Sequence, residues 1–181
     1  MKKLLAAISA LTYMMSAGAD TPADKKLGAA PPAADIPQIE FVFEERVLID
    51  APVVLGDTAY GYRQYIPITG GTVAGPRLEG QVVPGGWDFQ ITYAASKCTE
   101  LNADYFLKAK DGTVIHVFNQ GMFCPNAPRG IFHPRLEAPN GPHGWMTNAT
   151  FVATLEVEPP VAQPSGPPKV EAVRIRFYQV K

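Results

Sequence analysis

The sequence has little excess charge of either sign. It holds 16 lysines and arginines against 17 aspartates and glutamates, a formal net charge of −1 at neutral pH. It therefore lacks the basic surface that attracts nucleic acid or anionic membranes. Long apolar runs are also missing, since the longest, residues 4–15, is shorter than the roughly 20 residues that a bilayer-spanning helix needs. We expect no nucleic-acid partner and no transmembrane segment.

Several signatures of catalytic and cofactor sites are absent from the sequence. There is no Gly-x-Gly-x-x-Gly, no Gly-x-Ser-x-Gly, no Cys-x-x-Cys and no closely spaced histidine pair. His133 and His143 would need a third ligand to hold zinc, and His116 lies within a strand pattern, where a packing role is more common. A retaining glycosidase needs two carboxylates about 5 Å apart, and the sequence does not show which carboxylate, Asp104 or Glu79, would lie that close to Asp88. We expect neither a metal ion nor a cofactor.

The N-terminus has the pattern of a cleavable secretory signal. Lys2 and Lys3 precede the short apolar block, and small residues at 17–19 end it, so the pattern predicts a signal peptide over residues 1–19. A membrane anchor is the alternative, but the apolar block is too short for one. We therefore expect a periplasmic or secreted protein that begins at Asp20.

Two segments are poor in the apolar residues that build a core. Residues 20–35 are rich in Ala and Pro and predict a flexible leader, with a docking arm as the less favoured alternative. Residues 158–169 contain five prolines and predict a stiff, extended surface loop rather than a partner-binding motif. The remaining length, residues 36–181, suits one domain with a hydrophobic core.

Strand patterns dominate this domain. Apolar and polar residues alternate in Ile39–Ile49, Trp87–Tyr93, Thr150–Glu158 and Val170–Val180, as expected of half-buried strands. Short strands separated by Gly and Pro favour an antiparallel barrel or sandwich. We predict an all-β fold: a single, up-and-down-like antiparallel β-barrel of about eight strands with a central cavity.

The glycine-rich stretch from Tyr65 to Phe89 raises the question of a phosphate site. A phosphate loop needs its glycines at the start of a helix, whereas Gly75 is followed by Pro76 and then by strand-like residues. Glycine within strands is typical of bulges and barrel corners. The sequence thus predicts that Gly80 bends a strand and that Gly85-Gly86 forms a turn.

Cys98 and Cys124 are the only two cysteines. In an oxidising compartment an even count indicates a disulfide, although two free thiols or two metal ligands remain alternatives. A two-residue hairpin turn at Asp111-Gly112 would place Cys98 opposite Pro125, one position from Cys124. A single bulge would correct that mismatch and bring the sulfurs within bonding distance.

Asp88 is the candidate for acid–base chemistry. It lies between Trp87 and Phe89, on the opposite face of the strand from those aromatic rings. If its face lines a cavity, burial would raise the pKa of Asp88; if the face meets solvent, Asp88 is a surface residue. The pattern alone slightly favours the surface interpretation.

Three blocks of sequence resemble an uncharacterised family. They read GYRQYIPITGGTVAGPRLEGQVVPGGWDF, LNADYFLKAKDGTVIHVFNQG and FHPRLEAPNGPHGWMTNATFVAT. Together they are similar to domain of unknown function 3237, also called uncharacterised protein family 0311, over residues 39–180. The resemblance implies a β-barrel with a central cavity and implies these shared polar and aromatic positions: Tyr65, Arg77, Asp88, Asn119 and Trp145. The chain departs from the family pattern at Asp104 and at 147–148, which suggests a different ligand preference.

Three hypotheses of function follow. The first is an exported barrel that binds a small apolar or aromatic molecule between Trp and Tyr walls, oriented by Asp88, Arg77 and Asn119. The second is a cofactor-free isomerase, cyclase or lyase in which Asp88 acts as general acid or base in the same cavity. The third is a structural or interaction protein of the cell envelope. The residues name neither the ligand nor the oligomeric state.

Overall fold

The computed structural model describes residues 28–127 and 129–181. The predicted signal peptide lies outside the described residues. Residues 28–36 belong to a unit separate from the barrel and contain only the short 3-10 helix η1 (Ala33–Asp35). The barrel unit, Pro37–Lys181, is described by itself below.

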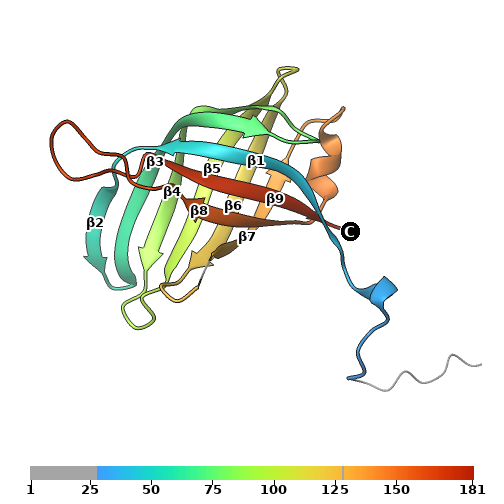
Figure 1. Cartoon of the computed structure of the whole chain (residues 1–181), viewed down its shortest axis with the longest axis horizontal. Coiled ribbons are helices and arrows are strands. Elements are labelled where there is room, and N and C mark those ends of the chain that lie inside the picture. The colour runs from blue at the N-terminus through green and yellow to red at the C-terminus, as the bar shows by residue number, and fades with distance from the viewer. Residues whose placement is uncertain (1–27, 128) are drawn as a thin grey trace, which may run out of the picture. The chain divides into compact units, whose positions relative to one another are not determined.

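In the described part of the chain, eight strands close into an antiparallel barrel and a ninth extends one edge (Figure 1). Strand β1 closes the ring because it pairs with β9 on one side and with β3 on the other. The remaining strands follow one another as a meander, which confirms the predicted all-β barrel. The strands are β1 (Ile39–Ile49), β2 (Val53–Thr58), β3 (Gly61–Ala74), β4 (Gly80–Thr92), β5 (Thr99–Ala109), β6 (Val114–Phe123), β7 (Gly130–Glu137), β8 (Phe151–Val157) and β9 (Ala172–Val180).

The extra strand arises because β3 is longer than its neighbours. Strand β1 pairs with the second half of β3 and β2 pairs with its first half, along the same edge. Residues 50–52 separate β1 from β2. One end of the barrel wall is therefore extended by the β2–β3–β4 layer (Figure 1).

Two glycine pairs of the Tyr65–Phe89 stretch, Gly70-Gly71 and Gly85-Gly86, lie at register shifts of the sheet, and no glycine of the stretch begins a helix. Gly71 has φ +144°, and a Cβ there would lie 2.1 Å from the carbonyl oxygen of Arg46, so only glycine permits this approach of β3 to β1. The prediction that Gly85-Gly86 forms a turn is wrong. Both residues lie within β4, where the register with β5 shifts between Val83 and Trp87, as in a β-bulge that increases curvature.

The hairpin between β5 and β6 differs from the predicted two-residue turn. The amide of Ala109 donates to the carbonyl of Thr113, and the amide of Gly112 (φ +89°) donates to the carbonyl of Ala109. This three-residue loop with a left-handed glycine shifts the register by one position. Cys98 and Cys124 therefore follow the Thr99–Phe123 pair directly, and they form a disulfide with Cα atoms 4.2 Å apart.

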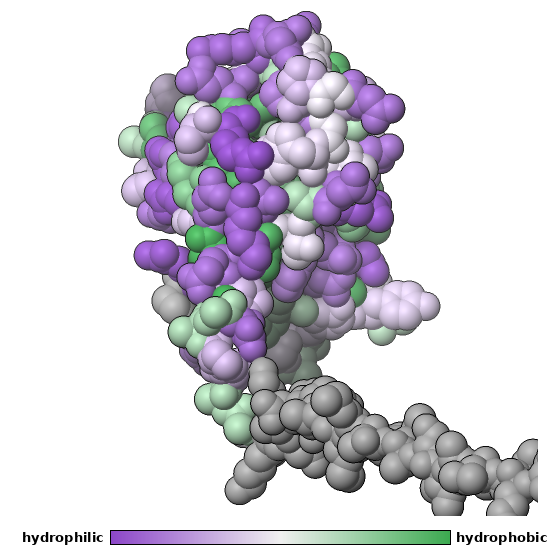
Figure 2. Space-filling view, turned by 90° about the vertical axis from the view of Figure 1, so that its right-hand side faces the viewer, coloured by the Kyte–Doolittle hydropathy of each residue, from purple (hydrophilic) through white to green (hydrophobic). Residues whose placement is uncertain are grey.

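The two ends of the barrel differ. The 3-10 helix η2 (Gly144–Asn148) lies at one end, where it buries Met146. The Pro-rich residues 158–171 extend from the other end, beside β2, and contain a single bridge between Val161 and Lys169 (Figure 1). Hydrophilic side chains cover most of the face seen in Figure 2. Among the described residues no helix is both long and apolar enough to cross a membrane.

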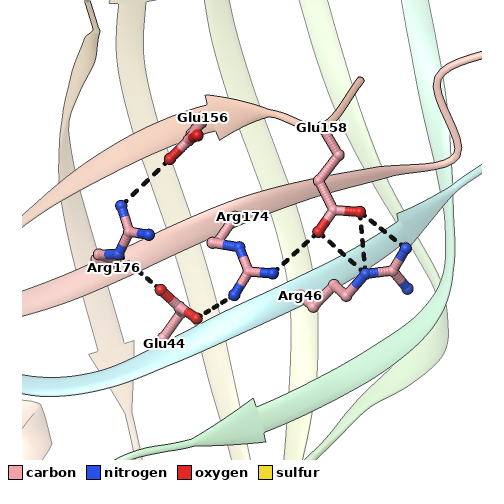
Figure 3. Close-up of polar contacts among 6 residues, drawn as sticks. All are labelled: Glu44, Arg46, Glu156, Glu158, Arg174 and Arg176. Carbon is pink, nitrogen blue, oxygen red and sulfur yellow. Dashed lines mark hydrogen bonds and ion pairs between the residues drawn. The ribbon is translucent and has the colours of Figure 1, made fainter. Parts of the chain in front are cut away.

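A cluster of ion pairs crosses the outer face where the ring closes. Arg46 and Arg174 lie opposite each other in the β1–β9 register, and both pair with Glu158, at 2.8 Å and 3.3 Å. Arg174 also pairs with Glu44. The cluster continues through Arg176 to Glu156 (Figure 3). Alternating charge thus connects β1, β9 and the end of β8.

Candidate functional site

The barrel encloses a cavity of about 540 Å³ at the end that carries β2 and the Pro-rich loop. Its wall is mostly apolar, and a few polar side chains project into it, the usual composition of a small-molecule site. The apolar part comes from β1, β3 and β5 to β9, and includes Val47, Ile68, Leu101, Phe132, Leu155 and Ile175.

One row across the sheet carries two of the polar side chains that line the cavity. Asp88 on β4 pairs with Ala103 on β5, and Ala103 pairs with Asn119 on β6. All three side chains line the cavity. Because the middle residue has only a methyl group, the carboxyl of Asp88 and the amide of Asn119 flank an open position on the wall.

Asp88 is held in place by two donors and is almost completely buried. Its Oδ2 accepts a hydrogen bond of 2.7 Å from Gln90 Nε2, and its Oδ1 accepts one of 2.9 Å from the backbone amide of Asn102. Gln64 donates in turn to Gln90, at 2.7 Å. Burial raises the pKa of Asp88 to about 6, although these two hydrogen bonds act to lower it. The surface interpretation of Asp88 is therefore wrong.

Asn119 presents an unused acceptor to the same space. Its side chain is buried, and its Oδ1 has no hydrogen-bond partner among the described residues. Buried polar atoms are normally paired, because leaving one without a partner costs about 1–3 kcal/mol. This amide oxygen, two strands away from Asp88, is thus able to accept a hydrogen bond from a molecule in the cavity.

A second carboxyl is buried deeper in the barrel. Glu45 on β1 is fully inaccessible, and its Oε2 accepts a hydrogen bond of 2.8 Å from the hydroxyl of Tyr105 on β5. Its Oε1 has no partner among the described residues. Burial raises the pKa of Glu45 to about 8, with a smaller opposing effect from the Tyr105 hydroxyl. Glu45 is therefore protonated at neutral pH.

Tyr105 occupies space that a glycine leaves free. A Cβ on Gly86 would lie 2.4 Å from the Cβ of Tyr105. The backbone of β4 at Gly86 can therefore pack directly against Tyr105, because Gly86 has no side chain there. Tyr105 is buried and lines the cavity, whereas Glu45 is not among the lining residues, so the phenol connects the buried carboxyl to the cavity.

Residues of two separate segments border the mouth of the cavity. Asp50, Ala51 and Pro52 follow β1, while Lys169 and Val170 end the Pro-rich loop. The ammonium of Lys169 lies 2.6 Å from Asp50 Oδ1 and lowers the pKa of that carboxyl. This ion pair joins the loop to the rim of the barrel.

The structure separates the residues that the family resemblance implied. Asp88 and Asn119 meet in the cavity, but Tyr65, Arg77 and Trp145 are not among its lining residues. Tyr65 contacts Phe89, with ring centroids 5.9 Å apart, on the side of β4 opposite Asp88. The guanidinium of Arg77 lies 3.5 Å from the ring centroid of Trp145, which belongs to η2 at the other end of the barrel.

Sequence reasoning missed Glu45, Tyr105, Gln64 and Gln90. The signal was strand parity: Glu45 has the same parity as Phe43 and Val47, which both point inward. A glutamate within an inward-facing apolar set is the kind of exception that marks a functional position. Parity could not show that this set, rather than the other face, forms the interior.

The arrangement is suited to hydrogen bonding and proton transfer. Two carboxyls with raised pKa values lie in or beside one apolar cavity, and such pairs are candidates for general acid–base roles. Among the described residues, no group of three or more His, Cys, Asp or Glu side chains could hold a metal ion. In the interior, Asp88, Glu45 and the hydroxyl of Tyr105 are groups that can accept, donate or move a proton.

Several solved structures, from bacteria and from a fungus, have this barrel. A protein of unknown function from Clostridium acetobutylicum superposes with a TM-score of 0.69 at 30% identity, covering 80% of this chain and 99% of the other. A β-barrel-like protein from Acinetobacter baumannii gives 0.67 at 23% identity, covering 85% and 99%. An enzyme from Penicillium herquei gives 0.62 at 19% identity, covering 86% and 100%. The last two likenesses concern the fold.

Sequence similarity agrees with the structural likeness. A UPF0311 protein of Clostridium acetobutylicum is 32% identical over 158 residues, which is 78% of this chain and 92% of that protein. A UPF0311 protein of Rhodopseudomonas palustris is 31% identical over 133 residues, which is 65% and 86%. Residues 37–180 match the family described as "Protein of unknown function (DUF3237)". The chain therefore belongs to the DUF3237 family, as its three sequence blocks predicted.

Proposed function

We propose that this protein is exported and binds a small, largely apolar molecule in the barrel cavity. The observation that carries the proposal is the buried Oδ1 of Asn119, which has no partner among the described residues and lies in the same mostly apolar wall as Asp88. An unpaired buried acceptor is costly, and a ligand hydrogen would satisfy it. Of the predicted Trp and Tyr walls, only Tyr105 is among the lining residues; the rest of the wall is mainly aliphatic, with Phe123 and Phe132.

The polar groups favour a ligand that donates a hydrogen bond. Asn119 Oδ1 accepts, and the carboxylate of Asp88 accepts once it is ionised above pH 6. The one cationic side chain among the lining residues, Lys169, lies at the mouth and is paired with Asp50. A ligand with an O–H or N–H group directed to Asp88 or Asn119 fits this arrangement, whereas an anionic group at either position does not.

A fluorescent probe with one N–H group tests this proposal. N-phenyl-1-naphthylamine is apolar and gains fluorescence when it leaves water, so titration should give saturable binding. Ala103→Leu fills the position between Asp88 and Asn119 and should abolish binding. The matched change Ala74→Leu, at an exposed position of β3, should leave it intact.

Comparing an N–H probe with its N-methylated form tests the hydrogen bond to Asn119. Asn119→Leu should weaken the N–H probe about 5- to 10-fold, in line with a net hydrogen bond of about 1–1.5 kcal/mol, and should not weaken the N-methylated probe. The proposal fails if wild-type protein binds neither probe, or if Ala103→Leu binds as well as wild type.

Catalysis in the same cavity is the second candidate function. The raised pKa of Asp88 favours it, because a carboxyl that titrates near neutral pH can accept and return a proton. Asp88→Asn separates the two candidates. A binding protein should keep its affinity for the neutral probe, and an enzyme should lose turnover while it keeps binding.

A further inference from the structure

Glu45 and Tyr105 form a buried pair that packing alone does not explain. The carboxyl is fully inaccessible and makes one hydrogen bond, to Tyr105, among the described residues. Burying a carboxyl with so few partners is costly, and apolar residues of similar volume often stabilise a core as well or better. We therefore infer that Glu45 and Tyr105 have a functional role, because burying this pair lowers the stability of the protein.

The pair and Asp88 belong to the same wall. Asp88 pairs with Ala103, and Tyr105 lies two residues farther along β5, on the same face. Diagonal neighbours of this kind lie about 7–8 Å apart. The negative charge of Asp88 contributes to raising the pKa of Tyr105, which agrees with this proximity. A small molecule in the cavity can thus contact the carboxyl of Asp88 and the phenol of Tyr105 together.

The protonation states of the three groups complement each other. At neutral pH burial keeps Glu45 protonated, whereas Asp88 is largely ionised. A protonated carboxyl can donate to the oxygen of Tyr105, and the hydroxyl hydrogen of Tyr105 can rotate to point elsewhere. In that arrangement Tyr105 is free to donate into the cavity, with Glu45 strengthening it as a donor.

We propose that the cavity catalyses proton transfer on apolar carbonyl compounds, with Asp88 as base and Tyr105 as hydrogen-bond donor to the carbonyl oxygen. Glu45 is the positioning residue, since it acts through Tyr105. A base, a tyrosine and a neutral carboxylic acid together in an apolar site are the groups that stabilise an enolate in ketosteroid isomerase. The inference rests on the proposed function, because it requires that the cavity bind an apolar molecule.

The step is balanced without any further reactant. Asp88 takes a proton from the carbon next to the carbonyl group, so a C–H bond breaks and its electron pair forms a C=C bond. The carbonyl oxygen becomes an enolate oxygen, which accepts the hydrogen bond from Tyr105. Asp88 then returns the proton to the same carbon or to a conjugated one, and the second outcome isomerises the substrate.

Deuterium exchange tests the step without knowledge of the natural substrate. The probe is 2-tetralone, an apolar ketone with acidic hydrogens beside its carbonyl group. In D₂O buffer, mass spectrometry should show deuterium entering 2-tetralone faster with the protein than in buffer alone. Asp88→Asn should reduce the rate to the buffer rate. Tyr105→Phe should lower kcat about 100-fold, the usual loss of one oxyanion donor.

The variant Glu45→Gln tests whether Glu45 positions Tyr105 for catalysis or has only a structural role. We expect kcat for exchange to fall at least 10-fold while KM stays within 2-fold, because the carboxamide cannot hold Tyr105 in the same way. Tyr62→Phe and Glu40→Gln change the same residue types at exposed positions and should leave both constants unchanged. If Glu45→Gln does not fold, Tyr105→Phe, which removes one oxygen atom, still gives the kcat comparison.

The outcomes separate the two proposals. If N-phenyl-1-naphthylamine does not bind, the proposed function fails. If the naphthylamine binds but 2-tetralone exchanges no faster than in buffer, the cavity binds without this chemistry and the inference alone is overturned. Exchange that persists in Asp88→Asn, or that is unchanged in both Tyr105→Phe and Glu45→Gln, overturns it as well.

Discussion

The hydroxyl of Tyr105 donates a hydrogen bond of 2.8 Å to Oε2 of Glu45, across the interior of the barrel from β5 to β1. The two side chains come from strands that are not paired with each other. The contact therefore crosses the interior of the closed barrel, where the two side chains pack against each other. It also places the most deeply buried carboxyl next to a residue of the cavity wall.

Glu45 should make stability depend on pH. Its pKa is about 8 in the folded protein against 4.5 for the free group, so the folded state holds a proton that the unfolded chain has released. The contribution of this group to the free energy of unfolding is therefore fully present below pH 4.5 and is lost as the pH rises to 8. The free energy of unfolding falls by up to about 1.4 kcal/mol per pH unit over this range.

Urea denaturation of Glu45→Gln at several pH values checks this expectation. The variant should gain stability relative to wild type steadily between pH 5 and 8, and the difference should level off above pH 8. Glu40→Gln, an exposed change on the same strand, should run parallel to wild type. A constant difference between Glu45→Gln and wild type would contradict the raised pKa.

Gly86→Ala should destabilise the protein by about 1–3 kcal/mol. The new methyl group would lie 2.4 Å from the Cβ of Tyr105 and 2.9 Å from the carbonyl oxygen of Asp104, and such overpacking displaces the backbone or the ring. Thermal denaturation measures the loss, and Pro84→Ala, a change in the same bulge, serves as control. Equal stability of both variants would show that β4 can move away from Tyr105.

Removing the disulfide should cost about 3 kcal/mol, because the bond restricts the unfolded chain between Cys98 and Cys124. Replacing both cysteines by serine should lower the denaturation midpoint by the same amount as a reducing agent lowers that of wild type. Alkylation of unreduced wild-type protein followed by mass spectrometry should find no modified thiol. Two modified thiols would mean that the bond does not form.

Glu158→Gln should destabilise the closure of the ring by up to about 1 kcal/mol at low salt. Arg46 and Arg174 lie opposite each other, and Glu158 neutralises both, so its loss leaves like charges facing one another. Sodium chloride should shrink the effect by screening. Glu79→Gln, which removes an isolated exposed pair with Lys110, should have less effect at either salt concentration.

Local patterns were sufficient to predict the strands and their class. The predicted strand Ile39–Ile49 has the bounds of β1, because the alternation of apolar and polar residues is a local property of the chain. Burial itself alternates only from Phe43 onward, since the register shifts between Phe41 and Phe43 and Val42 is buried. Glycines followed by proline and strand-like residues excluded a phosphate loop for the same local reason. The family blocks added that a cavity should be present.

What the tertiary structure decided was which face of each strand is the inside. Trp87 and Phe89 are about half exposed while Asp88 is buried, the reverse of what hydrophobicity favours, because closing the ring turns Asp88 toward the cavity. A three-residue hairpin loop, not a two-residue one, set the register that joins Cys98 to Cys124. Alternation specifies two faces, and only the pairing of β1 with both β3 and β9 determines which of them encloses Glu45, Asp88 and Asn119.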